Sequence, residues 1–388
     1  MTARDALHRA EVFRDDALAT PVHSGRTAAV LGVCLGVSFT VSLLTGLYSH
    51  LLQHPVGWLP IPSRPVGLYR VTQGLHIATG IAALPLLLAK LWSVYPRLFT
   101  WPPFRSIAHA LERLTLVLLV CGSAFMLFTG IAHIERWYPW RFFFTNGHYW
   151  VAWITIGALI MHIGAKATTT RRVLRRGGDR TATTTPTGAL SRRGFLGAVG
   201  AASGALTLAT VGQTFTPLSK LVLFAPRRVD VGSQGVPVNR AASEAGIASA
   251  ATHPDYRVVV RGRVGQSIAL TAADLVQRSV HVAGLPIACV EGWSVSASWR
   301  GVRVGDLLRE AGVPDGQAVD VDVVSLEEGG LYARSSLNER EVWDDDTLLA
   351  THLNGERLNL DHGYPVRLIG PNRPGVLQTK WVSELVVR

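Results

Sequence analysis

Cys289 is the only cysteine in residues 214–388, and it lies in the run Ala-Cys-Val-Glu-Gly-Trp-Ser at residues 288–294. A single thiol cannot form an intrachain disulfide within that part of the chain. Three roles remain open for it: a metal ligand, a nucleophile, or a small buried apolar side chain. The role of this one sulfur decides what chemistry the C-terminal half can perform.

Two histidines in the first half have a spacing that suits metal ligation. His148 and His162 are 14 residues apart in an apolar stretch, so a helix would carry both imidazoles on one face, about 21 Å apart along its axis. Ionisable side chains within membrane spans are costly and are usually functional. Because imidazole is a common axial ligand of b-type haem, the pair predicts haem sites near opposite faces of a bilayer.

The partner ligands are expected from other apolar stretches at matching depth. His76, early in the second stretch, is level with His148, and His23, just before the first stretch, is level with His162. Two more histidines are alternatives for the inner and the outer site, respectively: His109 and His133. Small residues on these stretches could admit a porphyrin or could only let helices pack closely: Gly80, Gly122, Gly130 and Gly157.

Five stretches are long and apolar enough to be membrane helices. We place them at residues 28–52, 69–94, 108–134, 148–167 and 194–211. Tryptophan and tyrosine mark several of their ends, as is typical of membrane interfaces. The chain is therefore expected to pass through the cell membrane several times and to contact lipid.

The charge distribution supports this interpretation and gives an orientation. Residues 214–388 hold 18 basic and 20 acidic side chains, whereas residues 1–213 hold 20 basic and 7 acidic ones. The basic residues flank apolar stretches rather than cover a soluble surface, so a nucleic-acid partner is not expected. The arginines between stretches four and five, and the basic residues between two and three, predict cytoplasmic loops. Residues 214–388 then lie outside the cytoplasm.

The layout of the first four stretches resembles the cytochrome b561 family and the cytochrome b subunits of hydrogenases and formate dehydrogenases. The resemblance covers about residues 20–170 and rests on few residues. It implies an all-α transmembrane four-helix bundle with one or two b haems. By position, His76 and His148 would hold the outer haem, and His23 and His162 the inner one.

The fifth stretch follows Ser-Arg-Arg-Gly-Phe-Leu-Gly at residues 191–197, which resembles a twin-arginine export signal. The alternative is that Arg192 and Arg193 are two further cytoplasmic positive charges. We divide the chain into an N-terminal cytoplasmic segment (1–26), a cytochrome b-like membrane domain (27–170), a basic cytoplasmic linker (171–193), a fifth helix (194–213) and an extracytoplasmic domain (214–388).

The C-terminal part alternates short apolar runs with turns, which predicts a strand-rich α+β domain. Strands are expected at residues 256–264, 319–325, 366–369 and 384–387. Thr271 is expected to cap a short helix, and residues 305–311 to form another. About 175 residues are enough to bury one core.

Several sequence blocks of this domain occur together in one enzyme family. They are Cys-Val-Glu-Gly-Trp-Ser at 289–294, Trp-Arg-Gly-Val at 299–302, Asp-Leu-Leu at 306–308, Leu-Asn-Gly-Glu-Arg-Leu at 353–358, Asp-His-Gly-Tyr-Pro-Val-Arg-Leu at 361–368 and Gln-Thr-Lys-Trp at 378–381. In this order they resemble the sulfite oxidase family of molybdopterin enzymes, over about residues 237–387.

The resemblance implies that Cys289 ligates a catalytic molybdenum beside the dithiolene of one molybdopterin. Arg367 and Lys380 stand where the family places basic residues that contact the pterin, and His362 stands at a polar pterin contact. Asn239 is a further contact by position. A pterin phosphate needs cations and N–H donors, which makes these residue types suitable. Taken alone, Arg367 and Lys380 would be interpreted as solvated strand charges.

The sequence departs from true sulfite oxidases in two respects. The chain ends at Arg388, directly after the last block, so the dimer of sulfite oxidases is not expected. The arginines that bind sulfite have no clear counterparts; Arg300, Arg334 and Arg373 are only candidates. Both features favour a resemblance to the exported methionine-sulfoxide-reductase type, in which a separate haem membrane protein supplies electrons.

The sequence therefore predicts a membrane-bound molybdenum oxidoreductase fused to its own electron-transfer domain. It would move one oxygen atom to or from a small oxo substrate, with sulfoxide-like reduction favoured and a quinone or another membrane donor or acceptor as redox partner. Oxidation of a sulfite-like substrate is an alternative. Two others remain: a metal-free membrane-anchored binding or sensor protein, and an enzyme whose membrane helices are a haem-free anchor.

Overall fold

The structure is a computed structural model that describes residues 21–59, 61–98, 106–142, 144–175, 191–211, 222–224, 227–229, 231–330 and 333–388. The chain divides into two compact units. The first comprises Met1–Leu44 and Leu75–Thr210, and the second comprises Thr45–Gly74 and Val211–Arg388. The second unit therefore includes a short stretch that lies between the first two long helices in the sequence.

Within the described residues, five helices are long and apolar enough to cross a membrane, as the sequence predicted. They are α2 (Gly25–Gln53), α3 (Leu68–Leu98), α4 (Ile107–Ile134), α5 (Phe144–Arg175) and α6 (Arg192–Val211), and a single turn, η1 (Pro21–His23), precedes them. The shortest, α6, has 20 residues and is about 30 Å long at 1.5 Å per residue. Length and composition thus make all five suitable for a bilayer.

Two of these helices extend into the predicted linker, residues 171–193. Helix α5 continues past residue 167 to Arg175, so Arg171, Arg172 and Arg175 are helical. Helix α6 begins at Arg192, and the Ser191 hydroxyl accepts a hydrogen bond from the Gly194 N–H at 3.1 Å. Residues 176–190 of the linker, residues 1–20 of the N-terminal segment and residues 212–221 lie outside the described part of the chain.

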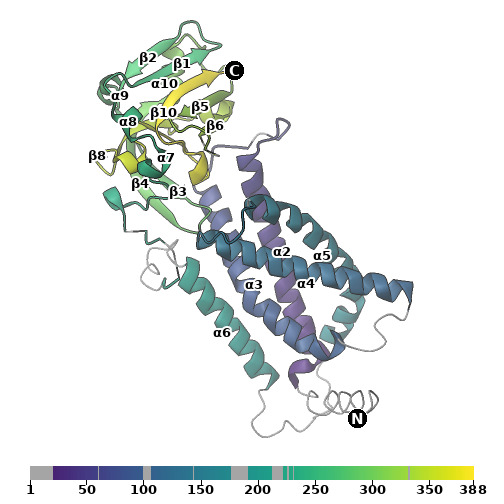
Figure 1. The fold of residues 1–388 in the computed structure, drawn as a ribbon. Coiled ribbons are helices and arrows are strands. Elements are labelled where there is room, and N and C mark those ends of the chain that lie inside the picture. The colour runs from purple at the N-terminus through teal and green to yellow at the C-terminus, as the bar shows by residue number, and fades with distance from the viewer. Residues whose placement is uncertain are drawn as a thin grey trace. The chain divides into compact units, whose positions relative to one another are not determined.

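The helices of the first unit pack through small and aliphatic side chains. Leu35 of α2, Ala83 and Leu87 of α3, and Leu127 of α4 form one buried cluster. Helices α4 and α5 approach closely at Gly122, where an added Cβ would lie 2.3 Å from the Thr155 hydroxyl. Figure 1 shows α2 to α5 alongside one another. Helix α6 joins α3 through Ser203, which donates to the Ala82 carbonyl at 3.1 Å.

The second unit is strand-rich and contains two five-stranded sheets (Figure 1). The first has the order β2-β1-β10-β5-β6, in which only β1 and β10 pair in parallel. Its strands are β1 (Arg257–Gly262), β2 (Ile268–Thr271), β5 (Val321–Ser325), β6 (Arg334–Leu337) and β10 (Val382–Val387).

The second sheet has the order β3-β4-β7-β8, and β9 also pairs with β7. Its strands are β3 (His281–Ala288), β4 (Ser294–Arg303), β7 (Leu348–Leu353), β8 (Glu356–Arg357) and β9 (Arg367–Ile369). Short helices connect the strands: η4 (Ser233–Gly235), α7 (Ala242–Ala245), α8 (Ala248–Thr252), α9 (Ala272–Gln277), α10 (Val304–Glu310), α11 (Glu339–Val342), η5 (Leu360–His362) and η6 (Gly375–Leu377).

Two apolar clusters form the core of this unit. The larger one lies on the first sheet and includes the buried valines of β1 and β5 and the leucines of α10. The other lies on the second sheet and includes Cys289, Trp293 and Trp299. Trp293 and Trp299 are 2% and 0% exposed and belong to this core.

The local predictions for this domain are confirmed, and six further strands were not predicted: β2, β3, β4, β6, β7 and β8. Thr271 accepts from the Asp274 N–H at 3.0 Å and caps α9, and α10 (304–310) lies one residue before the expected range of 305–311. The predicted strands correspond to β1, β5, β9 and β10. The antiparallel pair β3–β4, which carries Cys289 in its connecting turn, was not predicted because its small and polar residues give a weak strand signal.

Candidate molybdopterin site

Cys289 lies in the tight turn between β3 and β4. Its N–H donates to the Trp293 carbonyl at 2.9 Å, and its own carbonyl accepts from the Gly292 N–H at 3.1 Å. Gly292 has a φ of 90°, a conformation that glycine adopts without strain. The cysteine side chain is 3% exposed, so this turn holds the thiol inside the domain.

The surroundings of the thiol keep it protonated when no metal is bound. Burial, together with the nearby Glu291 carboxylate, raises the pKa of Cys289 to about 12. A buried thiol of this kind is a poor nucleophile at neutral pH. It becomes a thiolate when a cation or a metal compensates the charge, because metal ligation displaces the proton.

Arg367 and Lys380 place two cations near Cys289 in the same unit. Arg367 is 3% exposed, and its Nε has no hydrogen-bond partner among the residues the structure describes. Its guanidinium stands 5.5 Å above the Trp299 ring, and burial lowers its pKa to about 10. Lys380 donates only to backbone carbonyls within the described residues, those of Arg240 at 2.9 Å and Asp361 at 2.7 Å.

Burial, and next the positive charge of Arg367, lower the pKa of Lys380. Together they hold this pKa well below its ordinary 10.5. Gly363 brings the two residues together, because a Cβ there would lie 3.0 Å from the Arg367 Cβ and 3.3 Å from the Lys380 Cα. Its φ of 110° is also one that other residues rarely adopt. The fold thus holds two basic side chains close together, with Arg367 buried and Lys380 half-buried.

His362 lies beside Arg367, and Asn239 contacts Arg227. His362 is 1% exposed, its Nε2 donates to the Ser233 carbonyl at 2.7 Å, and its own carbonyl accepts from Arg367 at 3.3 Å. Burial lowers the pKa of His362 to about 4, so this histidine is neutral at physiological pH. Asn239 offers its carbonyl to Arg227 at 3.4 Å.

Arg227 and Glu291 are site residues that the sequence analysis missed. Arg227 Nε lies 2.8 Å from Glu291 Oε2, and the same carboxylate accepts from the Trp293 indole at 3.0 Å. Arg227 also donates to the Val238 carbonyl. Glu291 lies inside the cysteine motif, which could have marked it. Arg227 lies in no motif, and only the fold brings it to the cysteine.

The arginines considered as sulfite ligands have other surroundings. Arg373 is 3% exposed and forms an ion pair with Glu341, and it also donates to the carbonyls of Ser336 and Leu377 at 3.0 and 3.1 Å. Arg300 and Arg334 are exposed side chains on β4 and β6. Arg373 therefore has its charge neutralised within the domain.

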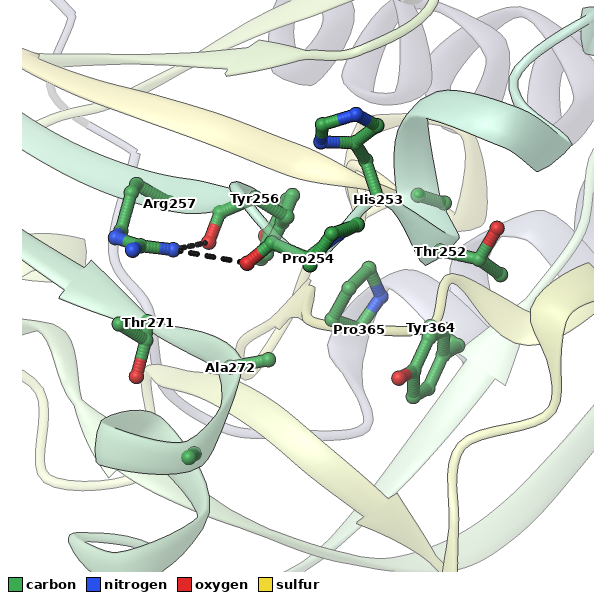
Figure 2. A pocket seen from close by; sticks show the side chains of 11 residues that line it. Thr252, His253, Pro254, Tyr256, Arg257, Thr271, Ala272, Tyr364 and Pro365 are labelled. Carbon is green, nitrogen blue, oxygen red and sulfur yellow. Dashed lines mark hydrogen bonds between the residues drawn. The ribbon is translucent and has the colours of Figure 1, made fainter.

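The second unit also contains a hollow. It has a volume of about 400 Å³ and is lined by Tyr256, Arg257, Thr271, Tyr364 and their neighbours (Figure 2). Arg257 donates to the carbonyls of Pro254 and Tyr256 at 3.2 and 2.8 Å, so its charge is engaged by the backbone. None of the predicted site residues lines this hollow.

In the helical unit, the structure brings His76 and His148 together. Their ring centroids are 6.2 Å apart and their planes meet at 68°. His76 Nδ1 bonds the Ser42 carbonyl at 2.8 Å. His148 Nδ1 bonds the Thr129 hydroxyl at 2.9 Å, and that hydroxyl donates to the Phe125 carbonyl. Both rings thus carry the proton on Nδ1 and the lone pair on Nε2, the tautomer of many metal-bound histidines.

The other histidines have different neighbours. The His23 ring lies 5.7 Å from that of Trp92, His133 Nδ1 bonds the Tyr138 hydroxyl at 3.1 Å, and His109 lies in the first turn of α4. The inner pair, His23 and His162, stays a prediction. The glycines divide: Gly122 and Gly130 face Thr155 and His148 of α5, whereas Gly80 and Gly157 have open space where a side chain would be.

Comparison with known proteins identifies the C-terminal part. Residues 245–388 match the family model of the oxidoreductase molybdopterin binding domain. The chain therefore carries a molybdopterin-binding oxidoreductase domain, and the predicted site residues from Cys289 to Lys380 all lie within the matched range, with Asn239 just before it.

Curated relatives agree with this assignment over a limited range. A sulfite oxidase of Arabidopsis thaliana is 36% identical over 112 residues, which are 25% of this chain and 28% of that protein. A mitochondrial sulfite oxidase of Drosophila melanogaster is 36% identical over 100 residues (24% and 17%), and a nitrate reductase of Hordeum vulgare is 41% identical over 96 residues (23% and 11%). The matches thus span little more than a quarter of these relatives at most.

A solved structure is also similar to part of the chain. The sulfane dehydrogenase SoxCD of Paracoccus pantotrophus is 26% identical, with a TM-score of 0.32, over 34% of this chain and 38% of that one.

The residues present fit a molybdenum–pterin group. Within the described residues, no cluster of three or more His, Cys, Asp or Glu side chains could hold a metal by itself. A metal at Cys289 therefore needs donors from a cofactor. The buried, unpartnered Arg367 Nε and the nearby Lys380 suit the phosphate of such a cofactor, since charge-assisted bonds to phosphate are strong.

Proposed function

We propose that the protein is a membrane-bound molybdenum oxidoreductase that moves one oxygen atom to or from a small substrate. The observation that carries the proposal is a pair of cations near Cys289, the buried Arg367 and the half-buried Lys380, neither of which forms an ion pair of 4 Å or less within the described residues. Such a pair costs folding free energy unless an anion occupies the site. The family match supplies the identity of that anion, molybdopterin.

Each site residue then has a physical role. Cys289 is the protein ligand of molybdenum, and the turn at Gly292 holds its sulfur in place. Arg367 and Lys380 bind the pterin phosphate, and neutral His362 and Asn239 contribute polar contacts at the pterin. Glu291 is neutralised by Arg227, so the site stays favourable for an anion. When bound, the molybdenum supplies two-electron oxygen-atom transfer.

Electrons are proposed to travel through b haems in the helical unit. His76 and His148 would hold the outer haem: their ring centroids lie 6.2 Å apart, and the Nδ1 atom of each is hydrogen-bonded within the protein, which leaves Nε2 as the nitrogen that could bind a metal. A second, inner haem on His23 and His162 is the corresponding proposal for the cytoplasmic side, with His109 as the alternative inner ligand and His133 as the alternative outer one.

The proposed location is the cell membrane, with residues 214–388 outside the cytoplasm. The support is the five apolar helices and the concentration of arginine in residues 171–193, which include the end of α5 and the start of α6. Export of the domain with its cofactor would suit the twin-arginine-like motif at 191–197. A quinone or another membrane carrier would be the redox partner, with lipid around the helices.

We favour reduction of a sulfoxide-like oxo compound as the direction of the reaction. The neutralisation of Arg373 by Glu341 removes one of the three candidates for binding a sulfite-like anion. Oxidation of a sulfite-like substrate is the second candidate, and the two sulfite oxidases among the relatives favour it.

The first experiment compares cysteine variants in purified membranes. Cys289→Ser is expected to lose molybdenum by about tenfold or more, and with it turnover of methionine sulfoxide or sulfite. Cys34→Ser and Cys121→Ser are matched controls, since both cysteines are exposed on α2 and α4. Equal molybdenum in all three variants and the wild type would remove the ligand assignment, and absence of the metal from the wild type would favour a metal-free binding or sensor protein.

The second experiment tests the haem proposal by optical spectroscopy. Dithionite-reduced wild type is expected to show b-type α bands, and His148→Ala is expected to lose the outer-haem component. His54→Ala is the matched control, because His54 is an exposed histidine at the end of the first span. A wild type without these bands would make the helices a haem-free anchor.

A further inference from the structure

The second unit contains a part of the chain that no molybdopterin motif covers. Residues Thr45–Gly74, which include the end of α2, the start of α3 and the segment that joins them, belong to the same compact unit as Val211–Arg388. Ile61 and Ser63 are 9% and 8% exposed, and Val66 packs on the apolar cluster that contains Cys289. Side chains of this segment are therefore part of the buried interior of the domain.

Asn372 is the centre of the contact. Its side chain is 3% exposed, and its Oδ1 accepts from the Tyr69 N–H at 2.8 Å. Its Nδ2 donates to the Pro62 carbonyl at 2.8 Å and to the Tyr48 hydroxyl at 2.9 Å, and its N–H donates to the Val66 carbonyl at 3.2 Å. Tyr69 lies in the first turn of α3, where N–H groups lack helical partners, so Asn372 caps this helix from a distant part of the sequence.

The loop that carries Asn372 also contacts the strand before Cys289. Pro374 forms a parallel bridge with Ala288, and an added Cβ at Gly375 would lie 2.9 Å from the Ala288 carbonyl. Asn372 has a φ of 52°, a left-handed conformation that asparagine tolerates better than most residues. Residues 370–375 thus connect the segment 61–70 with the position of the thiol.

An ion-pair clamp holds the same segment on the other side. Arg64 donates to both carboxylate oxygens of Asp344, at 3.0 and 2.8 Å, and to Asp346 at 2.6 Å. Ser63 adds a bond of 2.7 Å to Asp344. The Asp344 side chain is only 6% exposed, whereas Arg64 is 51% exposed, so the segment brings a cation to a buried carboxylate of the domain.

We propose that residues 61–70 are a built-in docking element and that Asn372 is the positioning residue through which this element holds the loop 370–375 against the Cys289 turn. The docking and the positioning rest on geometry alone, and their effect on the molybdenum rests on the proposed function. Loss of the Asn372 side chain would release the segment and loosen the cysteine turn, while the cations that bind the cofactor stay in place.

The test uses the full chain in detergent and follows backbone hydrogen exchange. Asn372→Ala is expected to speed exchange about tenfold or more in peptides covering residues 61–70 and 286–293, and to leave the first sheet unchanged. Arg64→Ala should speed exchange in 61–70. Arg309→Ala is the matched control: Arg309 is 43% exposed and bridges Asp306 and Asp315 at 2.6 and 2.7 Å, and its loss should change neither peptide.

Three outcomes overturn the proposal. Unchanged exchange in both peptides would exclude docking, and a change confined to 61–70 would exclude positioning. A fall in protection across the whole domain would give Asn372 a general structural role. Asn372→Asp serves as a second variant, because it keeps the acceptor for the Tyr69 N–H and should restore part of the protection.

A spectroscopic readout connects the proposal to the metal. In the loaded protein, Asn372→Ala is expected to retain molybdenum but to shift the Mo(V) electron paramagnetic resonance signal, and Asn372→Asp to move it back towards that of the wild type. An identical signal in Asn372→Ala and wild type would contradict positioning of the ligand. A wild type without molybdenum would refute the proposed function instead, and the exchange data would still decide whether the segment docks.

Discussion

Arg367 and Arg373 are six residues apart, and each is 3% exposed, yet their surroundings differ in one decisive respect. Arg373 forms an ion pair with Glu341, whereas Arg367 faces Lys380 and has no carboxylate partner in the described part of the chain. A buried charge that is paired contributes to the fold, and one that is unpaired needs a ligand from outside. A buried arginine is therefore not a candidate binding residue because of its burial alone. It becomes one when no carboxylate of the protein pairs with it.

The same contrast separates two larger regions of the C-terminal unit. Around Asn372 and Asp344, the polar side chains are hydrogen-bonded within the protein: those of Asn372, Asp344, Arg64 and Ser63. Around Cys289, the positive charges of Arg227, Arg367 and Lys380 outnumber the negative charges of Glu291 and Asp361. The first region is complete without a ligand, and the second gains stability when an anionic cofactor binds. Four predictions test this difference, in order of decreasing effect.

Replacing the paired arginine should have the largest effect. Arg373→Met leaves Glu341 buried without its cation, which is expected to lower the free energy of unfolding by about 3–5 kcal/mol. Chemical denaturation of the cofactor-free chain measures this change. Arg373→Met with Glu341→Gln should recover much of the loss, and a double variant as unstable as the single one would show that the pair is not the cause.

Replacing the unpaired arginine should have the opposite sign. Arg367→Met removes an uncompensated buried charge, so the cofactor-free chain is expected to gain about 1–3 kcal/mol of stability. Cofactor retention on dialysis should fall at the same time. If Arg367→Met destabilises the cofactor-free chain as Arg373→Met does, the two sites are alike and the comparison fails.

Gly363→Ala should disturb the cation pair without touching a charge. At φ 110° the new Cβ would be strained and would lie 3.0 Å from the Arg367 Cβ, so we expect a loss of about 1–2 kcal/mol and weaker cofactor binding. Gly355→Ala is a control with a φ of 90° but nothing within 4 Å of the added atom. Equal cofactor retention in both variants would show that crowding of the cations does not matter.

Acidification should change the stability of the fold least, and it should act on the ion pair between Arg64 and Asp344. Burial raises the pKa of Asp344, but the bonds from Arg64 and Ser63 outweigh this and keep the pKa below its ordinary 3.8. Because the folded pKa is the lower one, the clamp stabilises the fold above about pH 4 and is lost as the pH falls through the folded pKa. The change should stay below about 1 kcal/mol, since Arg64 is half exposed.

Hydrogen exchange in residues 61–70 between pH 6 and pH 3, corrected for intrinsic rates, measures this loss. Asp344→Asn should exchange fast at both pH values. A wild type whose protection is constant over this range would show that the clamp does not depend on the Asp344 charge.

Much of the fold was predictable because its signals are local. Five apolar runs long enough to cross a bilayer predicted five helices. The described residues contain five such helices between Gly25 and Val211. The Thr271 cap depends on a residue three positions away, so it too was visible in the sequence. Strands β3 and β4 were not visible in the sequence. A run that contains glycine and serine forms a strand only when adjacent strands of the sheet supply its hydrogen bonds.

The site was predictable to the extent that it lies in motifs. The sequence by itself determined the cysteine, the basic residues and the paired histidines, because residue type and spacing are properties of the chain. Which arginine is paired, that Arg227 reaches Glu291, and that Asn372 caps α3 were decided only by the tertiary structure. The partners of these contacts are between 32 and 303 residues apart, and electrostatic pairing depends on distance in space rather than on position in the chain.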